Sequence, residues 1–135
     1  MIGSKWLLVV AVLSVGTLAA GCGGGDSAEV DGEQTTGASV EVGATLVASV
    51  GPGFDISLAT RDGQPVGAAA AGEYTIEVSD ESSIHNFHLT GPGVDEDSGV
   101  SEVGESTWTV TFGPGSYEFV CDPHPSMHGE LEVTS

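Results

Sequence analysis

Positive charge is nearly absent from this sequence of 135 residues. Lysine and arginine together number 2, against 20 aspartates and glutamates, so the formal net charge is −18 at pH 7. Nucleic acids and anionic membrane surfaces attract basic side chains, and a chain this acidic is therefore not expected to bind either directly. The acidity indicates either steering toward a basic redox partner or a solvated surface suited to solubility, and both interpretations stay open.

Cysteine is equally scarce, and the first of the two ends an N-terminal signal. Lys5 precedes an apolar run that closes with small residues just before Cys22. This pattern predicts a secretory signal over residues 1–21, and so export. It also resembles the bacterial lipoprotein signal, in which Cys22 would become the lipidated N-terminus. The implied location is the extracytoplasmic face of a membrane, at the cell surface or in the periplasm. The alternative is an ordinary cleaved signal.

The second cysteine, Cys121, is left without a disulfide partner if Cys22 is acylated. A free thiol in an oxidising compartment is exposed to oxidation, and metal ligation is one state that protects it. The sequence therefore favours a metal-binding role for Cys121.

Apolar periodicity is missing from residues 22–43, which are rich in glycine, serine, threonine and acids. After the lipidation site, this segment is predicted to be a flexible tether. Residues 44–135 are long enough for one small domain.

Helical periodicity is also missing from that domain. Turn signals of the form Gly-Pro-Gly recur at residues 51–53, 91–93 and 113–115, and apolar residues alternate with polar ones between them. About seven to eight short strands are expected, which indicates an all-β fold, an antiparallel β-sandwich or barrel. The expected strands include residues 46–50, 54–58, 74–78, 84–89, 108–112, 117–121 and 131–133.

The same alternation places the residues that could bind a metal. Cys121 follows Tyr117 and Phe119 on an inward face. His85 shares a face with apolar neighbours, whereas Asn86 and His88 are expected to point the other way, with His88 toward solvent.

A short loop, CDPHPSM, follows the strand that ends at Cys121. Its two prolines make it stiff, so it can present Cys121, His124 and Met127 to one point, with His85 supplied by a neighbouring strand. Thiolate, imidazole and thioether together form the ligand set of a His₂Cys copper site with a weak axial Met. A zinc site is the alternative, although zinc rarely takes a thioether ligand.

This constellation resembles the cupredoxins, the small blue copper proteins, and its Cys-x-x-His-x-x-Met spacing is similar to their plastocyanin, amicyanin and pseudoazurin branch. The resemblance implies a Greek-key sandwich holding one copper ion. His85, Cys121 and His124 would be strong ligands and Met127 a long axial one. Further implied roles lie around these ligands: Asn86 would tie the His85 segment to the cysteine loop, Asp122 would add negative charge beside the metal, and Pro123 and Pro125 would surround His124 at an electron port.

The function implied is one-electron transfer between membrane-bound and soluble redox proteins, such as a cytochrome, an oxidase or a dehydrogenase. Copper storage, delivery or sensing is the alternative, since it would use the same ligands. An enzyme is not expected, because a catalytic copper needs further histidines and only His88 and His128 are left over.

Overall fold

The computed structural model describes residues 37–135, and these form strands without any helix. The predicted signal, the lipidation site at Cys22 and most of the predicted tether lie outside the described residues. No helix within residues 37–135 is long and apolar enough to cross a membrane. The strands are β1 Ala38–Val40, β2 Thr45–Val50, β3 Ile56–Thr60, β4 Val66–Ala70, β5 Gly72–Asp80, β6 His88–Gly91, β7 Val94–Asp97, β8 Gly104–Phe112, β9 Gly115–Val120 and β10 His128–Thr134.

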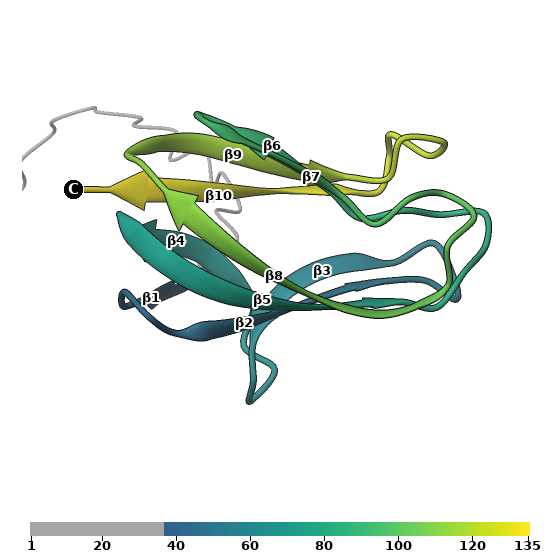
Figure 1. Ribbon diagram of the computed structural model, residues 1–135, viewed down its shortest axis with the longest axis horizontal. Helices are drawn as coiled ribbons and strands as arrows, with labels where there is room; N and C mark the ends of the chain where they lie inside the picture. Colours follow the sequence, from purple (N-terminus) through teal and green to yellow (C-terminus); the bar gives the residue numbers. More distant parts are fainter. Residues whose placement is uncertain (1–36) are drawn as a thin grey trace, which may run out of the picture. The chain divides into compact units, whose positions relative to one another are not determined.

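Two sheets face each other as the layers of a sandwich (Figure 1). One has the strand order β1-β4-β10-β9-β6-β7 and the other β3-β2-β5-β8. The prediction of an all-β sandwich is confirmed, but both sheets are mixed rather than purely antiparallel. Strand β2 pairs in parallel with β5 because the chain visits β3 and the other sheet before it returns.

The alternation that predicted the strands is visible in their burial. Along β5 every second residue is buried, and along β9 the same holds for Tyr117 and Phe119. Each buried row faces the opposite sheet, so the core lies between the layers. The largest fully buried side chains are Tyr74, Tyr117, Phe87, Phe112, Leu46, Ile76, Leu89 and Leu131.

Three strands lack this signal and were not predicted. Strand β4 reads VGAAA, whose small residues do not alternate, and β7 reads VDED, with a single apolar residue. Strand β1 pairs in parallel with β4 and buries Val40, although it lies in the segment predicted to be tether. Ordered pairing therefore begins before residue 44.

One predicted strand is shorter than expected. The segment predicted over residues 84–89 becomes regular only at His88, where β6 begins, and residues 84–87 form a turn and an irregular stretch. Because Asn86 is not in a strand, the direction of its side chain is not fixed by strand alternation. This difference matters at the site.

Two glycine-proline-glycine turns are joined by one tyrosine. The Tyr117 hydroxyl donates to the carbonyl oxygens of Pro92 and Gly113 and accepts from the Gly113 N–H. Gly93 adopts a φ of 74°, a left-handed conformation that favours glycine. The tie fixes the end of the domain where the C-terminal strand finishes.

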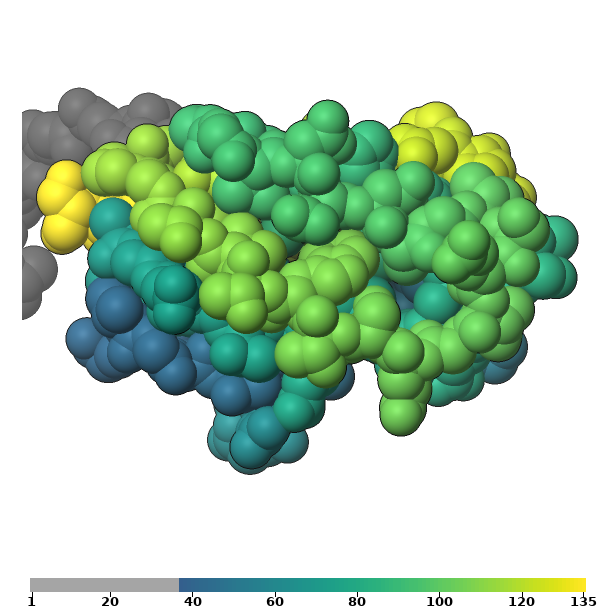
Figure 2. Space-filling model, in the orientation of Figure 1, coloured from purple at the N-terminus to yellow at the C-terminus, as the bar shows by residue number. Residues whose placement is uncertain are grey.

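The loop of residues 121–127 lies at the opposite end of the domain from the C-terminal residue (Figures 1 and 2). Here β9 turns into β10, and the segment before β6 approaches from its neighbour strand. The topology thus brings the two halves of the predicted metal site to one end of the sandwich.

Candidate metal centre

Three predicted ligands meet in the structure. The Nδ1 atoms of His85 and His124 are 2.9 Å apart, and the Sγ atom of Cys121 lies 3.4 Å from the first and 3.5 Å from the second. Cys121 and His85 are buried, with exposed fractions of 0% and 1%, and His124 is partly buried. The two histidines come from different loops, yet their coordinating atoms form a compact triangle with the sulfur.

This triangle has the size that a metal ion needs. A point equidistant from its three corners lies about 1.9 Å from each atom, close to the roughly 2.0–2.3 Å of bonds from a borderline metal to nitrogen and thiolate. One soft thiolate and two imidazoles suit copper or zinc, and a thioether nearby favours copper. The residues present therefore fit a single copper ion.

Backbone hydrogen bonds shape the loop that carries three of the four predicted ligands. The N–H of His124 donates to the Cys121 carbonyl, and the N–H of Met127 donates to the His124 carbonyl. The Cys121 N–H in turn donates to the Met127 carbonyl. Pro125 stands at the second position of the later turn, which its fixed φ favours. Met127 is buried by this closure, whereas Pro123 and Pro125 are exposed on either side of His124.

An aromatic residue that the sequence analysis missed covers the histidines. Phe54 was predicted to begin a strand, but β3 begins at Ile56 and Phe54 belongs to the preceding loop. Its ring lies edge-on to His85 and His124, with centroids 5.3 and 5.1 Å away. The side chain is 70% exposed, so it forms an apolar rim over the two imidazoles. Nothing in its local sequence distinguishes it from a strand residue.

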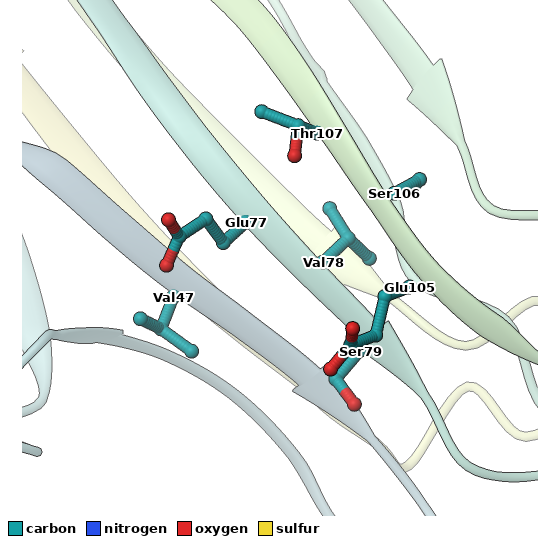
Figure 3. A pocket seen from close by; sticks show the side chains of 7 residues that line it. All are labelled: Val47, Glu77, Val78, Ser79, Glu105, Ser106 and Thr107. Carbon is teal, nitrogen blue, oxygen red and sulfur yellow. The ribbon is translucent and has the colours of Figure 1, made fainter.

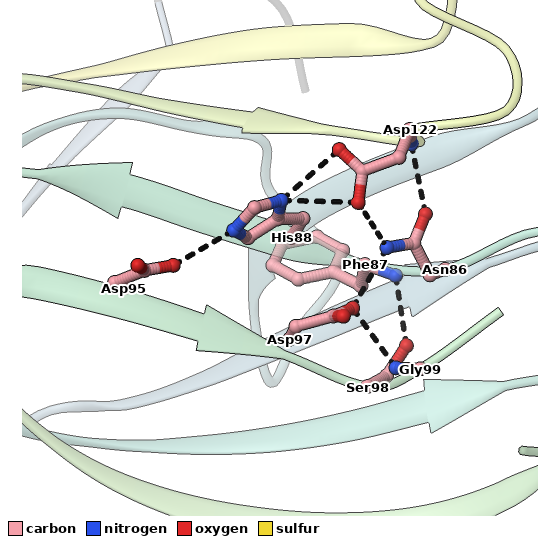
Figure 4. A network of polar contacts seen from close by, with 8 residues as sticks. All are labelled: Asn86, Phe87, His88, Asp95, Asp97, Ser98, Gly99 and Asp122. Atoms are coloured by element: carbon pink, nitrogen blue, oxygen red, sulfur yellow. Dashed lines mark hydrogen bonds and ion pairs between the residues drawn. The ribbon is translucent and has the colours of Figure 1, made fainter.

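Asn86 joins the His85 segment to the loop after Cys121 (Figure 4). Its Oδ1 accepts the Asp122 N–H at 2.8 Å, and its Nδ2 donates to the carboxylates of Asp122 and Asp97, each at 2.7 Å. Asn86 and His88 both bond to Asp122, in agreement with the expectation that they point the same way, but Asn86 is fully buried rather than on an open face. Burial is possible because these hydrogen bonds satisfy the amide.

His88 is also held more firmly than expected. Its ring nitrogens face Asp122 at 3.0 Å and Asp95 at 2.8 Å, and its side chain is only 23% exposed. Hydrogen bonds that His88 donates to Asp122 and Asp95 raise its pKa above the ordinary value. Hydrogen bonds from His88 and Asn86 lower the pKa of Asp122. The negative charge of Asp122 is therefore paired with His88.

The fourth histidine, His128, stays on the rim. It is exposed, and its Nδ1 donates to the Pro125 carbonyl at 3.0 Å. It is not among the residues whose coordinating atoms converge in the described part of the chain.

A shallow depression elsewhere has no comparable chemistry. It lies on the outer face of the four-stranded sheet (Figure 3), and its lining contains neither histidine nor cysteine. The lining residues are Val47, Glu77, Val78, Ser79, Glu105, Ser106 and Thr107.

Sequence comparison finds one curated relative of interest. Amicyanin-alpha of Methylorubrum extorquens is 38% identical to this chain over 66 residues, which cover 47% of this chain and 56% of that protein. The match confirms the predicted resemblance to the cupredoxins. The chain spans only about half the length of this cupredoxin relative. No protein-family model matches.

Solved cupredoxins are similar at lower identity. Reduced rusticyanin has a TM-score of 0.47 and 22% identity, covering 67% of this chain and 76% of that one. An oxidised amicyanin mutant has a TM-score of 0.45 and 15% identity, covering 66% and 81%. At these scores neither structure adds to what the site and the sequence match indicate.

Proposed function

We propose that this protein is a type 1 copper electron-transfer protein. The observation that carries the proposal is the convergence of two imidazole nitrogens and one thiol sulfur in a triangle of copper-binding size. His85, Cys121 and His124 would be the strong ligands, and Met127, from the same closed loop, the weak axial one. The likeness to amicyanin supports the same function.

Copper bound here would supply a one-electron Cu(I)/Cu(II) couple. The chain's own contribution is to hold the ligands still. Cys121 and His85 are buried at the edge of the core. The loop that carries His124 is closed by three backbone hydrogen bonds. Little rearrangement of these residues would accompany a change in copper charge, which favours fast electron transfer.

His124 is the proposed electron port. It is the most exposed of the three converging residues, and Phe54, Pro123 and Pro125 form an apolar surface around it. Apolar surface with one partly exposed ligand allows a partner to approach the metal closely while excluding water.

The proposed setting is outside the cytoplasm. Residues 1–21 would be a signal peptide, Cys22 the lipid attachment site and the following segment a tether to the membrane. Partners would be redox proteins, such as a cytochrome, an oxidase or a dehydrogenase, with a basic docking face opposed to the acidic chain. No catalytic role is proposed, since cupredoxins of this kind carry electrons.

A redox and copper-retention experiment tests the carrier function against copper delivery. The copper-loaded full chain should be reduced and reoxidised repeatedly with its copper retained when a moderate copper chelator is present. A carrier keeps its metal through many cycles. Release of copper to the chelator upon each reduction would favour delivery or storage instead.

A further inference from the structure

His88 lies on β6 outside the proposed ligand set, yet both of its ring nitrogens are engaged (Figure 4). Its Nδ1 is 3.0 and 3.1 Å from the two carboxylate oxygens of Asp122, and its Nε2 is 2.8 Å from an Asp95 oxygen. The ring therefore bridges β7 and the loop that follows Cys121.

These contacts determine which form of the ring fits. An ionised carboxylate only accepts hydrogen bonds, and a neutral imidazole has a single N–H. With a carboxylate on each side, only the imidazolium satisfies both nitrogens. The geometry thus requires a positive charge between Asp122 and Asp95.

Asp122 is the residue through which His88 reaches the site. Its N–H donates to Asn86 Oδ1, and its carboxylate accepts from Asn86 Nδ2 and from His88. The side chain of Asp122 is thus held from two directions, and its backbone N–H is part of the same cluster. The peptide held in this way directly follows Cys121.

We propose that His88 is a positioning residue for the metal centre, which holds the Asp122 side chain in place and compensates its negative charge beside Cys121. The holding role concerns the metal-free chain, whereas the effect on a reduction potential rests on the proposed copper function. His88 would not itself bind the metal, because it reaches the site only through Asp122.

Titratable groups approach His88 from the neighbouring strands and from the loop after β9. Asp95 and Asp97 face it from β7, and Asp122 faces it from the loop after β9. On β9 itself, Glu118 lies opposite Thr90, two residues along β6. On β10, His128 lies opposite Val120, the β9 partner of His88. Carboxylates dominate, so the protonated ring is favoured.

Loss of this proton has a defined consequence. As pH rises through the raised pKa of His88, Asp122 loses a charge-assisted donor and its negative charge is no longer compensated. Negative charge beside copper favours Cu(II) over Cu(I). The reduction potential should therefore fall as His88 deprotonates.

The first test uses the metal-free full chain. Amide hydrogen exchange of Asp122 is measured by NMR for the wild type, for His88→Gln and for the control His128→Gln, which removes a nearby histidine whose ring bonds to the Pro125 carbonyl instead. Exchange at Asp122 is expected to be roughly tenfold faster in His88→Gln, the size of one lost charge-assisted hydrogen bond. His128→Gln should match the wild type. Equal exchange in wild type and His88→Gln, or an equal acceleration in His128→Gln, would overturn the proposal.

The second test follows the reduction potential of the copper-loaded chains from about pH 5 to pH 9, across the range where histidines titrate. His88→Gln should have the lower potential at the acidic end, and its difference from the wild type should vanish as pH rises. A difference that does not change with pH would contradict charge compensation. If the wild type forms no blue copper site, the proposed function fails while the exchange test still decides the holding role.

Discussion

The Phe54 side chain lies outside the ligand motif, yet it contacts two of the proposed ligands. Its ring packs edge-on against both His85 and His124 while remaining 70% exposed. We expect an aromatic edge in this position to restrict the imidazoles and to limit the access of water to His124.

Replacing Phe54 by Ala should open the site without unfolding the protein. Copper should pass to a competing chelator several-fold faster, because water and chelator reach His124 more easily. The free energy of unfolding should change by less than about 1 kcal/mol, since the side chain is mostly exposed. The measurement is the rate of copper loss, followed by absorbance.

Val42→Ala is the matched control, because Val42 is another exposed apolar residue and lies beside Gly72, away from the metal site. It should leave the rate unchanged. Equal rates for Phe54→Ala and the wild type would show that the ring does not shield the site.

The Asp122 and His88 pair predicts a pH window of stability. The lowered pKa of Asp122 adds stability that is present above its ordinary value of about 3.9 and is lost as pH falls through the folded-state pKa. The raised pKa of His88 adds stability that is present below about 6.5 and is lost as pH rises through its folded-state pKa.

Denaturant unfolding of the metal-free chain and of Asp122→Asn measures this window. The free energy of unfolding of the wild type should exceed that of the variant most between about pH 3.9 and pH 6.5, the ordinary pKa values of the two groups. This difference should shrink on both the acidic and the basic side. A difference in the free energy of unfolding that stays constant from acid to base would show that the pair does not contribute through its charges.

At the scale of elements, the turn pair joined by Tyr117 gives a separate prediction. Removing its hydroxyl in Tyr117→Phe leaves the contacts to Pro92 and Gly113 unmade. The free energy of unfolding should fall by about 1–2 kcal/mol. The copper spectrum should not change, because these turns lie at the other end of the domain. Denaturant unfolding and the visible spectrum check the two parts, and a changed spectrum would contradict the separation.

Elements with regular alternation could be predicted from the sequence, whereas small or polar strands could not. Strands β5, β8 and β9 carry an apolar residue at every second position of their buried parts. Strand β4 contains only small side chains, and it is a strand because β1 and β10 pair with it. Pairing of this kind depends on distant residues, so local sequence does not show it.

Part of the candidate site could likewise be predicted from the sequence, and part could not. Cys121, His124 and Met127 are close in sequence, and two prolines between them limit the loop, so their proximity could be predicted. The contacts of Phe54 and His88 join separate loops and strands, and only the packed sandwich brings them near the loop. The burial of Asn86 could not be predicted, because it depends on hydrogen bonds to Asp97 and Asp122 from other segments of the chain.

The net charge of the whole protein affects how fast it associates with charged partners. The chain carries a formal −18 at pH 7 and should attract cations over a distance that salt shortens. Reduced copper-loaded protein should transfer electrons to a cationic metal ammine complex faster at low salt than at high salt. An anionic metal cyanide complex should show the opposite dependence. Stopped-flow rates across ionic strength provide the measurement, and the absence of a salt effect for both reagents would contradict electrostatic steering.

The central claim is that Cys121 is a copper thiolate flanked by His85 and His124. The most direct measurement is the visible and electron paramagnetic resonance spectrum of the full chain loaded with Cu(II), before and after ascorbate, beside the Cys121→Ser variant. We expect an intense blue band with narrow copper hyperfine splitting in the wild type, bleached by ascorbate, restored by oxidation and absent from the variant. A weak, ordinary Cu(II) spectrum in the wild type, unchanged by Cys121→Ser, would contradict the claim.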